Sequence, residues 1–214
     1  MWQPHGRFIV LEGIDGAGTT TQTRRLAERL RQDGCQVVTT CEPSSGPVGN
    51  LIRQALERRL RLNGDKALEL DWATLALLFA ADRTDHVSRC IEPALQSGAH
   101  VICDRYDLSS CIYQSLTSPD PELALRWVQD LNRQVRRPDL TVVLDIDPDV
   151  AEIRRSKRGT EPELFERRGL QQRLAVAYRD GQSYVPNDRL VHLDGALPVA
   201  EVTVCLHELC GTLD

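Results

Sequence analysis

Five short apolar runs recur along the chain, and longer stretches of mixed polar and apolar residues separate them. The runs cover residues 8–11, 36–39, 100–103, 140–144 and 190–193. They have the length of strands and are rich in β-branched residues, which favour strands. Their apolar character is nearly continuous rather than alternating, which predicts that both faces of each strand are covered, as in a parallel sheet.

Between these runs, apolar residues return at helical spacing. The stripes comprise Leu26 and Leu30; Leu68, Trp72, Leu75 and Phe79; Val87, Ile91 and Leu95; and Val199, Val202, Leu206, Leu209 and Leu213. Strands that alternate with such helices predict a doubly wound α/β sheet with right-handed crossovers. Ligands of these sheets bind at the carboxyl ends of the strands, so the residues that follow each apolar run are the candidate site residues.

The composition narrows the class of protein. The chain has 214 residues, of which 41% are hydrophobic and 27% charged, and its net charge is -5. These values predict one folded domain, residues 1–214, and argue against a protein that coats nucleic acid. No apolar run approaches the roughly 18 residues of a spanning helix, and the N-terminus lacks the layout of a signal peptide. We therefore expect no membrane partner.

Seven cysteines are present, at positions 35, 41, 90, 103, 111, 205 and 210. No two of them form a C-x-x-C pair, and most lie within apolar or helical stretches. This pattern favours buried thiols in a reducing cytoplasm over a disulfide framework or a zinc site. We expect a cytoplasmic protein.

The first apolar run leads into a glycine-rich loop. Gly13-Ile14-Asp15-Gly16-Ala17-Gly18-Thr19-Thr20-Thr21 matches the phosphate-binding pattern G-x-x-x-x-G-K-[ST] at every defined position except Thr19, which replaces the lysine. The glycines allow backbone amides to converge on phosphate oxygens, and Thr20 stands where a hydroxyl ligand of Mg²⁺ belongs. A simple glycine-rich turn with a threonine cap is the alternative.

The missing lysine bears directly on catalysis. Loss of one such electrostatic contact typically costs about 3–4 kcal/mol, or about 10²–10³ in rate. Either another cation supplies the charge or catalysis is weak.

Two further pairs suggest a nucleotide site. Phe79 and Arg83 are four residues apart on a predicted helix, so they share a face and could form a pyrimidine pocket. Phe79 could equally continue the core stripe while Arg83 pairs with an acid. Asp104 and Arg105 follow the third apolar run. Arg105 could grip a phosphate, with Asp104 orienting it or a hydrated Mg²⁺, or the arginine could form a surface ion pair.

The stretch from Phe8 to Gly18 resembles the opening of the thymidylate kinases. Further stretches resemble the same family in its order: residues 42–43, 51–53, 79–83, 104–110, 113–114 and 137–140. The resemblance covers roughly residues 7–180. It implies a P-loop kinase fold with a five-stranded parallel sheet flanked by helices on both faces, and a short mobile lid at approximately residues 154–166. It also implies ATP- and Mg²⁺-dependent phosphorylation of dTMP to dTDP by a homodimer.

The resemblance also implies roles for individual residues. It assigns residues 13–21 to ATP, Phe79 and Arg83 to the base, and Arg53 and Arg105 to the acceptor phosphate. Ser110 and Gln114 would bind the thymine edge, Tyr113 would lie near the sugar or pack in the core, and Asp15 would lie between the two phosphates. The substrate-binding positions are Glu42, Pro43, Arg53, Phe79, Arg83, Asp104, Arg105, Ser110, Tyr113 and Gln114.

A basic cluster precedes Gly159-Thr160-Glu161-Pro162 and resembles a lid. It contains Arg154, Arg155, Lys157 and Arg158. We expect a lid arginine, Arg158 first and Arg154 next, to replace part of the lysine charge; a basic helix face is the alternative. With Asp15 and Arg105, these two complete the expected catalytic set.

Two rival functions remain. One is a nucleotide-binding protein without turnover, against which the retention of Phe79, Arg83, Arg105 and Ser110 argues. The other is a related kinase for another nucleoside monophosphate or a deoxynucleoside.

Overall fold

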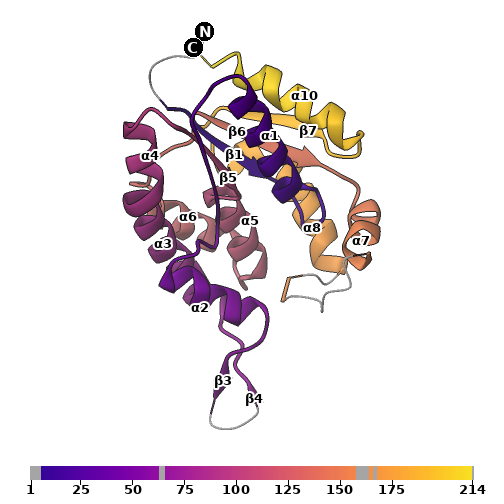
Figure 1. Ribbon diagram of the computed structural model, residues 1–214. Coiled ribbons are helices and arrows are strands. Elements are labelled where there is room, and N and C mark those ends of the chain that lie inside the picture. The colour runs from indigo at the N-terminus through magenta and orange to yellow at the C-terminus, as the bar shows by residue number, and fades with distance from the viewer. Residues whose placement is uncertain (1–5, 63–65, 158–163, 166–167, 214) are drawn as a thin grey trace.

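A five-stranded parallel sheet forms the centre of the protein (Figure 1). The computed structural model describes residues 6–62, 66–157, 164–165 and 168–213. The strands are β1 (Phe8–Glu12), β2 (Val37–Cys41), β5 (His100–Asp104), β6 (Leu140–Asp145) and β7 (Leu190–Asp194), in the spatial order β2-β5-β1-β6-β7. Each predicted apolar run overlaps one of these strands, with boundaries that differ by at most two residues. The predicted parallel sheet is therefore confirmed.

Burial along the strands follows their place in the sheet. The central strands β1 and β5 are buried at every residue, whereas the edge strands β2 and β7 are partly exposed. Val10 on β1 pairs with Cys103 on β5 and with Thr141 on β6, which fixes the register of the centre. A continuous apolar run therefore predicts burial of both strand faces better for the interior strands than for the edge strands.

Helices cover both faces of the sheet (Figure 1). They are α1 (Thr19–Gln32), α2 (Pro47–Leu56), α3 (Trp72–His86), the π-helical turn η1 (Val87–Ile91), α4 (Glu92–Gln96), α5 (Asp107–Thr117), α6 (Pro121–Leu131), α7 (Pro148–Ser156), α8 (Arg168–Arg179), α9 (Gly181–Tyr184) and α10 (Val199–Cys210). A two-stranded antiparallel hairpin, β3 (Arg61–Leu62) with β4 (Lys66–Ala67), projects beyond α2.

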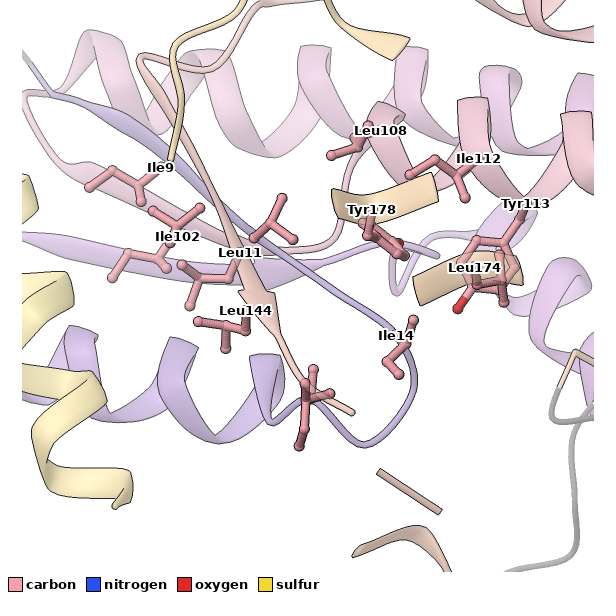
Figure 2. Close-up of a cluster of buried hydrophobic side chains, with 14 of the residues drawn as sticks. Ile9, Leu11, Ile14, Ile102, Leu108, Ile112, Tyr113, Leu144, Leu174 and Tyr178 are labelled. Atoms are coloured by element: carbon pink, nitrogen blue, oxygen red, sulfur yellow. The ribbon is translucent and has the colours of Figure 1, made fainter. Parts of the chain in front are cut away.

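Alternate residues of β1 serve the two cores. Ile9 and Leu11 belong to the larger hydrophobic cluster with Leu26 and Leu30 of α1. Figure 2 shows both β1 residues beside Ile102 of β5. Phe8 and Val10 point to the other face, where they pack with Ile91, Leu95 and their neighbours. This alternation follows from the two-residue period of a strand.

The predicted helical stripes are confirmed with local differences. Leu68 lies before α3, which begins at Trp72 because the Asp71 side chain accepts a 2.7 Å hydrogen bond from the amide of Thr74 as its cap. The closing helix ends at Cys210, before Leu213. The β3–β4 hairpin has only two residues in each strand, too few to produce a recognisable alternating pattern.

All seven cysteines are free thiols. The predicted burial is confirmed for Cys103, Cys111 and Cys210, whereas the four others are only partly buried. Across the residues that the structure describes, no helix is both long enough and apolar enough to cross a membrane.

Candidate active site

The candidate site lies where the chain connections diverge at the carboxyl edge of the sheet. β1 and β5 are neighbours, but the segment after β1 leads through α1 to β2, whereas the segment after β5 leads through α5 towards β6. The amide of Arg105 donates to the carbonyl of Leu11 at 2.9 Å, which joins the two segments. Such a switch point is the usual ligand site of an open α/β sheet.

The loop between β1 and α1 has the conformation that its glycines allow. Gly16 and Gly18 have φ values of 96° and 100°, in the left-handed region that glycine tolerates. A Cβ at Gly16 would lie 2.6 Å from the carbonyl oxygen of Ala151 on α7. The backbone of α7 therefore leaves no room for a larger residue at position 16. The loop ends at the N-terminus of α1, whose dipole and amides favour an anion.

Thr20 and Asp104 come together beside this loop. The Thr20 hydroxyl donates a short hydrogen bond to Oδ2 of Asp104, which is buried at the end of β5. Oδ1 of Asp104 is buried and has no hydrogen-bond partner among the described residues. A hydroxyl next to a carboxylate with an unused oxygen matches the oxygen ligands that Mg²⁺ prefers.

No cluster of three or more His, Cys, Asp or Glu side chains suited to a metal occurs in the described ranges. Mg²⁺ commonly takes one or two protein ligands and completes its shell with water and substrate phosphate. The Thr20–Asp104 pair fits that kind of site.

A cavity of about 240 Å³ opens at the same edge. It brings together residues that lie far apart in the sequence and that the sequence predicted as one site. Its lining includes Asp15, Glu42, Pro43, Phe79, Arg83, Arg105, Ser110, Tyr113 and Gln114. Leu56, Tyr106, Ser109 and Phe165 complete the lining.

Arg83 forms the most buried charged contact of this cavity. Its Nε donates to Glu42 at 2.9 Å, and its Nη2 lies 2.6 Å from the same carboxylate oxygen. Nη1 donates to Asn132 at 2.5 Å, and Nη2 donates to Ser110 at 2.8 Å. Burial alone would lower the pKa of Arg83, but the carboxylates of Glu42 and Asp107 raise it above its ordinary value. Arg83 thus both pairs with an acid and lines the cavity.

Gln114 also lines the cavity and is buried. Its Oε1 is buried and has no hydrogen-bond partner within the part of the chain that the structure describes. Buried polar atoms are normally paired, so this oxygen is a candidate contact for a ligand donor.

Arg105 lies between the cavity and the phosphate loop. Its Nη2 forms a 2.6 Å ion pair with Asp15, and its guanidinium lies 5.6 Å from the centre of the Tyr113 ring. Nη1 donates to Ser109 at 3.2 Å and to Tyr178 at 3.0 Å. The arginine has a φ of 69°, a backbone conformation that is uncommon for residues other than glycine. It is held on several sides rather than extended into solvent.

Tyr113 packs in the core and also reaches the cavity, while its place near the sugar stays a prediction. Its ring packs edge-on against Phe165 in the core, and its hydroxyl donates to Asp15 at 3.3 Å. It also lines the cavity.

Arg53 does not line this cavity. On α2, its Nη1 donates to the carbonyl of Pro43 at 2.6 Å and its Nη2 to that of Ser44 at 2.9 Å. These bonds support the loop that carries Glu42 and Pro43. The assignment of Arg53 to the acceptor phosphate stays a prediction.

The basic cluster reaches the other side of the phosphate loop. Arg154 donates to the carbonyl of Gly195 at 3.0 Å, and Arg155 donates a short hydrogen bond to the carbonyl of Asp15. Arg154 also lines a second cavity, of about 250 Å³, next to Gly16 and Gly18. Arg158 and most of the expected lid lie outside the described residues.

Comparison with known proteins gives the family. The model of the thymidylate kinase family matches residues 11–203. The chain is 39% identical over 210 residues to a probable thymidylate kinase of Pyrococcus abyssi, covering 96% of this chain and 98% of that protein. It is 41% identical over 206 residues to the thymidylate kinase of Dinoroseobacter shibae, covering 94% of each. The chain belongs to the thymidylate kinase family.

Membership confirms the family expected from the sequence motifs, the P-loop kinase fold and the enzyme class, a phosphotransferase. Thr19 is nonetheless the first residue of α1 and is buried at the position of the P-loop lysine. A third similar protein, a probable thymidylate kinase of Thermococcus kodakarensis, is 47% identical over 144 residues, or 65% of this chain and 66% of that protein.

The structure adds residues that the motifs did not reveal. Glu12, Ser109, Tyr178 and Gln171 surround Arg105 and Asp15. Glu12 gives a sequence signal, a carboxylate at the end of an apolar run, and Ser109 lies next to Ser110. Tyr178 and Gln171 come from α8, which is distant in sequence and carries no motif.

Proposed function

We propose that this chain transfers the γ-phosphoryl group of ATP to dTMP, giving dTDP and ADP, and that Mg²⁺ assists the transfer. The supporting observation is that the phosphate loop and the cavity containing Arg83 and Gln114 meet at Arg105. This arrangement can hold a donor phosphate chain and a nucleoside monophosphate end to end. In-line positioning of two phosphates is the main requirement for phosphoryl transfer.

The side chains of the cavity support the proposed preference for thymine. Each Nη nitrogen of arginine carries two N–H groups, so Nη1 of Arg83 keeps a second donor beside its bond to Asn132. Thymine offers the O4 acceptor, whereas cytosine offers an amino donor at the same position. The unpaired Oε1 of Gln114 is complementary to the thymine N3–H. Phe79 supplies an aromatic wall for the ring.

Arg105 is the proposed anchor of the acceptor phosphate. Its Nη2 binds Asp15, whose side chain is partly exposed, so a phosphate oxygen can also accept a hydrogen bond from this edge of the guanidinium. Nη1 stays attached to Ser109 and Tyr178 and maintains the orientation. The acceptor oxygen of dTMP is largely ionised at neutral pH, so the transfer needs no general base. Asp15 and Arg105 remain the proposed catalytic pair of this region.

The phosphate loop is the proposed binding site of the ATP phosphates. Its amides would contact the phosphate oxygens, and Thr20 and Asp104 would hold Mg²⁺, directly or through water. When bound, the cation neutralises charge on the phosphates. The second cavity, beside Arg154, is the proposed place of the adenosine part.

Arg155 is the described cation best placed to compensate for Thr19. Its guanidinium donates a short hydrogen bond to the carbonyl of Asp15 within the phosphate loop. Arg154 reaches the loop only through a long hydrogen bond, 3.5 Å to the carbonyl of Ala17, beside its 3.0 Å bond to Gly195. The proposed contribution of Arg158 stays open because its position is not described. A homodimer is also proposed from the family likeness, with α3, where Leu77 is exposed, as the candidate contact.

The acceptor preference tests this proposal. Release of ADP from Mg-ATP should be measured with dTMP, dUMP, dCMP, dGMP and AMP as separate acceptors. We expect dTMP to give the highest kcat/KM, with dCMP at least tenfold lower because its amino group faces the Arg83 donors. Equal values for dTMP and dCMP would contradict the proposed base contacts.

A further inference from the structure

A carboxylate lies beneath the proposed acceptor site, where the apolar strand β1 ends. Glu12 has no exposed surface. Its Oε1 accepts hydrogen bonds from the amides of Tyr106 at 2.8 Å and Ser109 at 3.2 Å. Its Oε2 accepts from the Ser109 hydroxyl at 2.6 Å and from the Tyr178 hydroxyl at 3.2 Å. Four donors from two segments therefore converge on one buried acid.

The same two hydroxyls connect Glu12 to Arg105. Nη1 of Arg105 donates to Ser109 and to Tyr178, and these hydroxyls lie 2.8 Å apart. Each hydroxyl has one hydrogen to donate. An ionised carboxylate only accepts, so both hydrogens point along the path towards Glu12 and leave lone pairs facing Arg105. The charge on Glu12 therefore sets the direction of the bonds that it accepts from the two hydroxyls and of the bonds that these hydroxyls accept from Arg105.

We propose that Glu12 is a positioning residue for the acceptor phosphate: its carboxylate orients Ser109 and Tyr178 so that they hold one edge of Arg105. The inference rests on the proposed role of Arg105. The other edge, at Nη2, faces Asp15 and is the edge a phosphate would share. Glu12 thereby fixes the guanidinium without occupying its ligand-binding edge.

The charge on Glu12 can change near neutral pH. Burial raises its pKa to about 7, although the positive charge of Arg105 and the hydrogen bonds from Ser109 and Tyr106 oppose the shift. The other groups that face it are Tyr113 and Tyr178 and the thiols of Cys103 and Cys111. Burial raises the pKa of each of these four groups, so they stay neutral. Protonated Glu12 would gain a donor and disturb the direction of the network.

The substitution Glu12→Gln tests this role because it keeps the size of the side chain. Its amide nitrogen would donate to Ser109 and Tyr178 where the carboxylate accepts. Calorimetric titration should measure the Kd of dTMP and of ATP separately, at pH 8 and at pH 6. We expect the Kd of dTMP to rise about tenfold at pH 8 and less at pH 6, with the Kd of ATP within about twofold.

A matched control removes an acid elsewhere. Glu28→Gln, on the exposed side of α1 where Glu28 pairs with Arg24, should leave both affinities unchanged. Tyr178→Phe should weaken dTMP binding by a smaller factor, and the double variant with Glu12→Gln should lose less than the product of the two single losses. If Glu12→Gln does not fold, as judged by circular dichroism, Tyr178→Phe alone tests the inference. Weaker dTMP binding would support it, and unchanged dTMP binding would overturn it.

Unchanged dTMP affinity in Glu12→Gln, or an equal loss for dTMP and ATP, would overturn the inference. Turnover is measured in parallel on the unmodified chain. A chain that binds dTMP without turning it over would overturn the proposed function alone, because the binding measurements would still decide the role of Glu12.

Discussion

Replacement of Arg83 by methionine should destabilise the fold strongly, because it strands a buried acid. The side chain of Arg83 is 1% exposed and that of its partner Glu42 is 2% exposed. Methionine is apolar and of comparable length, so the main loss is the guanidinium with its bonds to Glu42, Asn132 and Ser110. Removing one partner of a buried ion pair typically costs about 3–5 kcal/mol.

This cost is large relative to the whole stability of a domain, about 5–15 kcal/mol. For a chain of this size it corresponds to a fall in Tm of about 6–20 °C. Differential scanning calorimetry on the two purified proteins measures the difference. His86 contacts Glu42 at 3.2 Å, and this one contact does not replace the bonds of the guanidinium.

Arg89→Met is the matched control. Arg89 also pairs with an aspartate, Asp85 at 2.5 Å, but its side chain is 78% exposed. Exposed pairs of this spacing contribute about 0.5 kcal/mol or less. Adding Glu42→Gln to Arg83→Met should recover part of the lost Tm, because it removes the stranded charge. If the Tm of Arg83→Met is no lower than that of Arg89→Met, the claim that the buried Arg83–Glu42 pair stabilises the fold is wrong.

Three further outcomes follow from the site. Gln114→Leu should raise the KM for dTMP about tenfold with little change in the KM for ATP, because it removes the unpaired acceptor. ADP release measures both values, and equal changes would contradict the contact between Gln114 and thymine. Asp104→Asn should raise the Mg²⁺ concentration that gives half the maximal rate, since the carboxylate beside Thr20 loses its charge. An unchanged Mg²⁺ titration would contradict the proposed role of Asp104. Arg155→Met should lower kcat by about 10²-fold, whereas Lys157→Met, at the exposed residue directly after the same helix, should not. Similar effects would contradict Arg155 as the substitute for lysine.

Stability should also depend on pH through Glu12. Its pKa is raised from 4.5 to about 7 in the folded protein, so the folded state holds a proton that the unfolded state has lost in this range. The resulting stabilisation is complete below pH 4.5 and is lost as the pH rises to about 7, a contribution of about 3 kcal/mol. The free energy of unfolding, measured by urea at several pH values, should therefore depend less on pH in Glu12→Gln. The same change of the free energy of unfolding with pH in both proteins would contradict a buried Glu12 that titrates in this range.

The sequence predicts the sheet well because the five apolar runs depend on local composition. It also places Phe79 and Arg83 on one face, because helical spacing is local. It does not show that Arg83 is sealed by Glu42 and Asn132, since those residues lie 41 and 49 positions away in the chain. Only the fold determines such partners.

The same limit applies to the lysine substitute. The sequence identifies a basic cluster near the lid and favours Arg158 and Arg154 as the substitute, which stays a prediction. Residues 154 and 155 are adjacent on α7 but contact different carbonyls: Arg154 donates to Gly195 and Ala17, and Arg155 donates to Asp15. The orientation of α7 against the phosphate loop determines which carbonyl each arginine reaches, and no local pattern encodes that orientation.

The central claim is that the chain phosphorylates dTMP although Thr19 replaces the P-loop lysine. Phosphorus NMR on a mixture of the protein, Mg-ATP and dTMP follows donor and acceptor in one experiment. The account predicts that dTDP and ADP appear together in equal amounts and that neither appears without dTMP. ATP and dTMP that persist unchanged, or ADP that appears with inorganic phosphate but without dTDP, would contradict it.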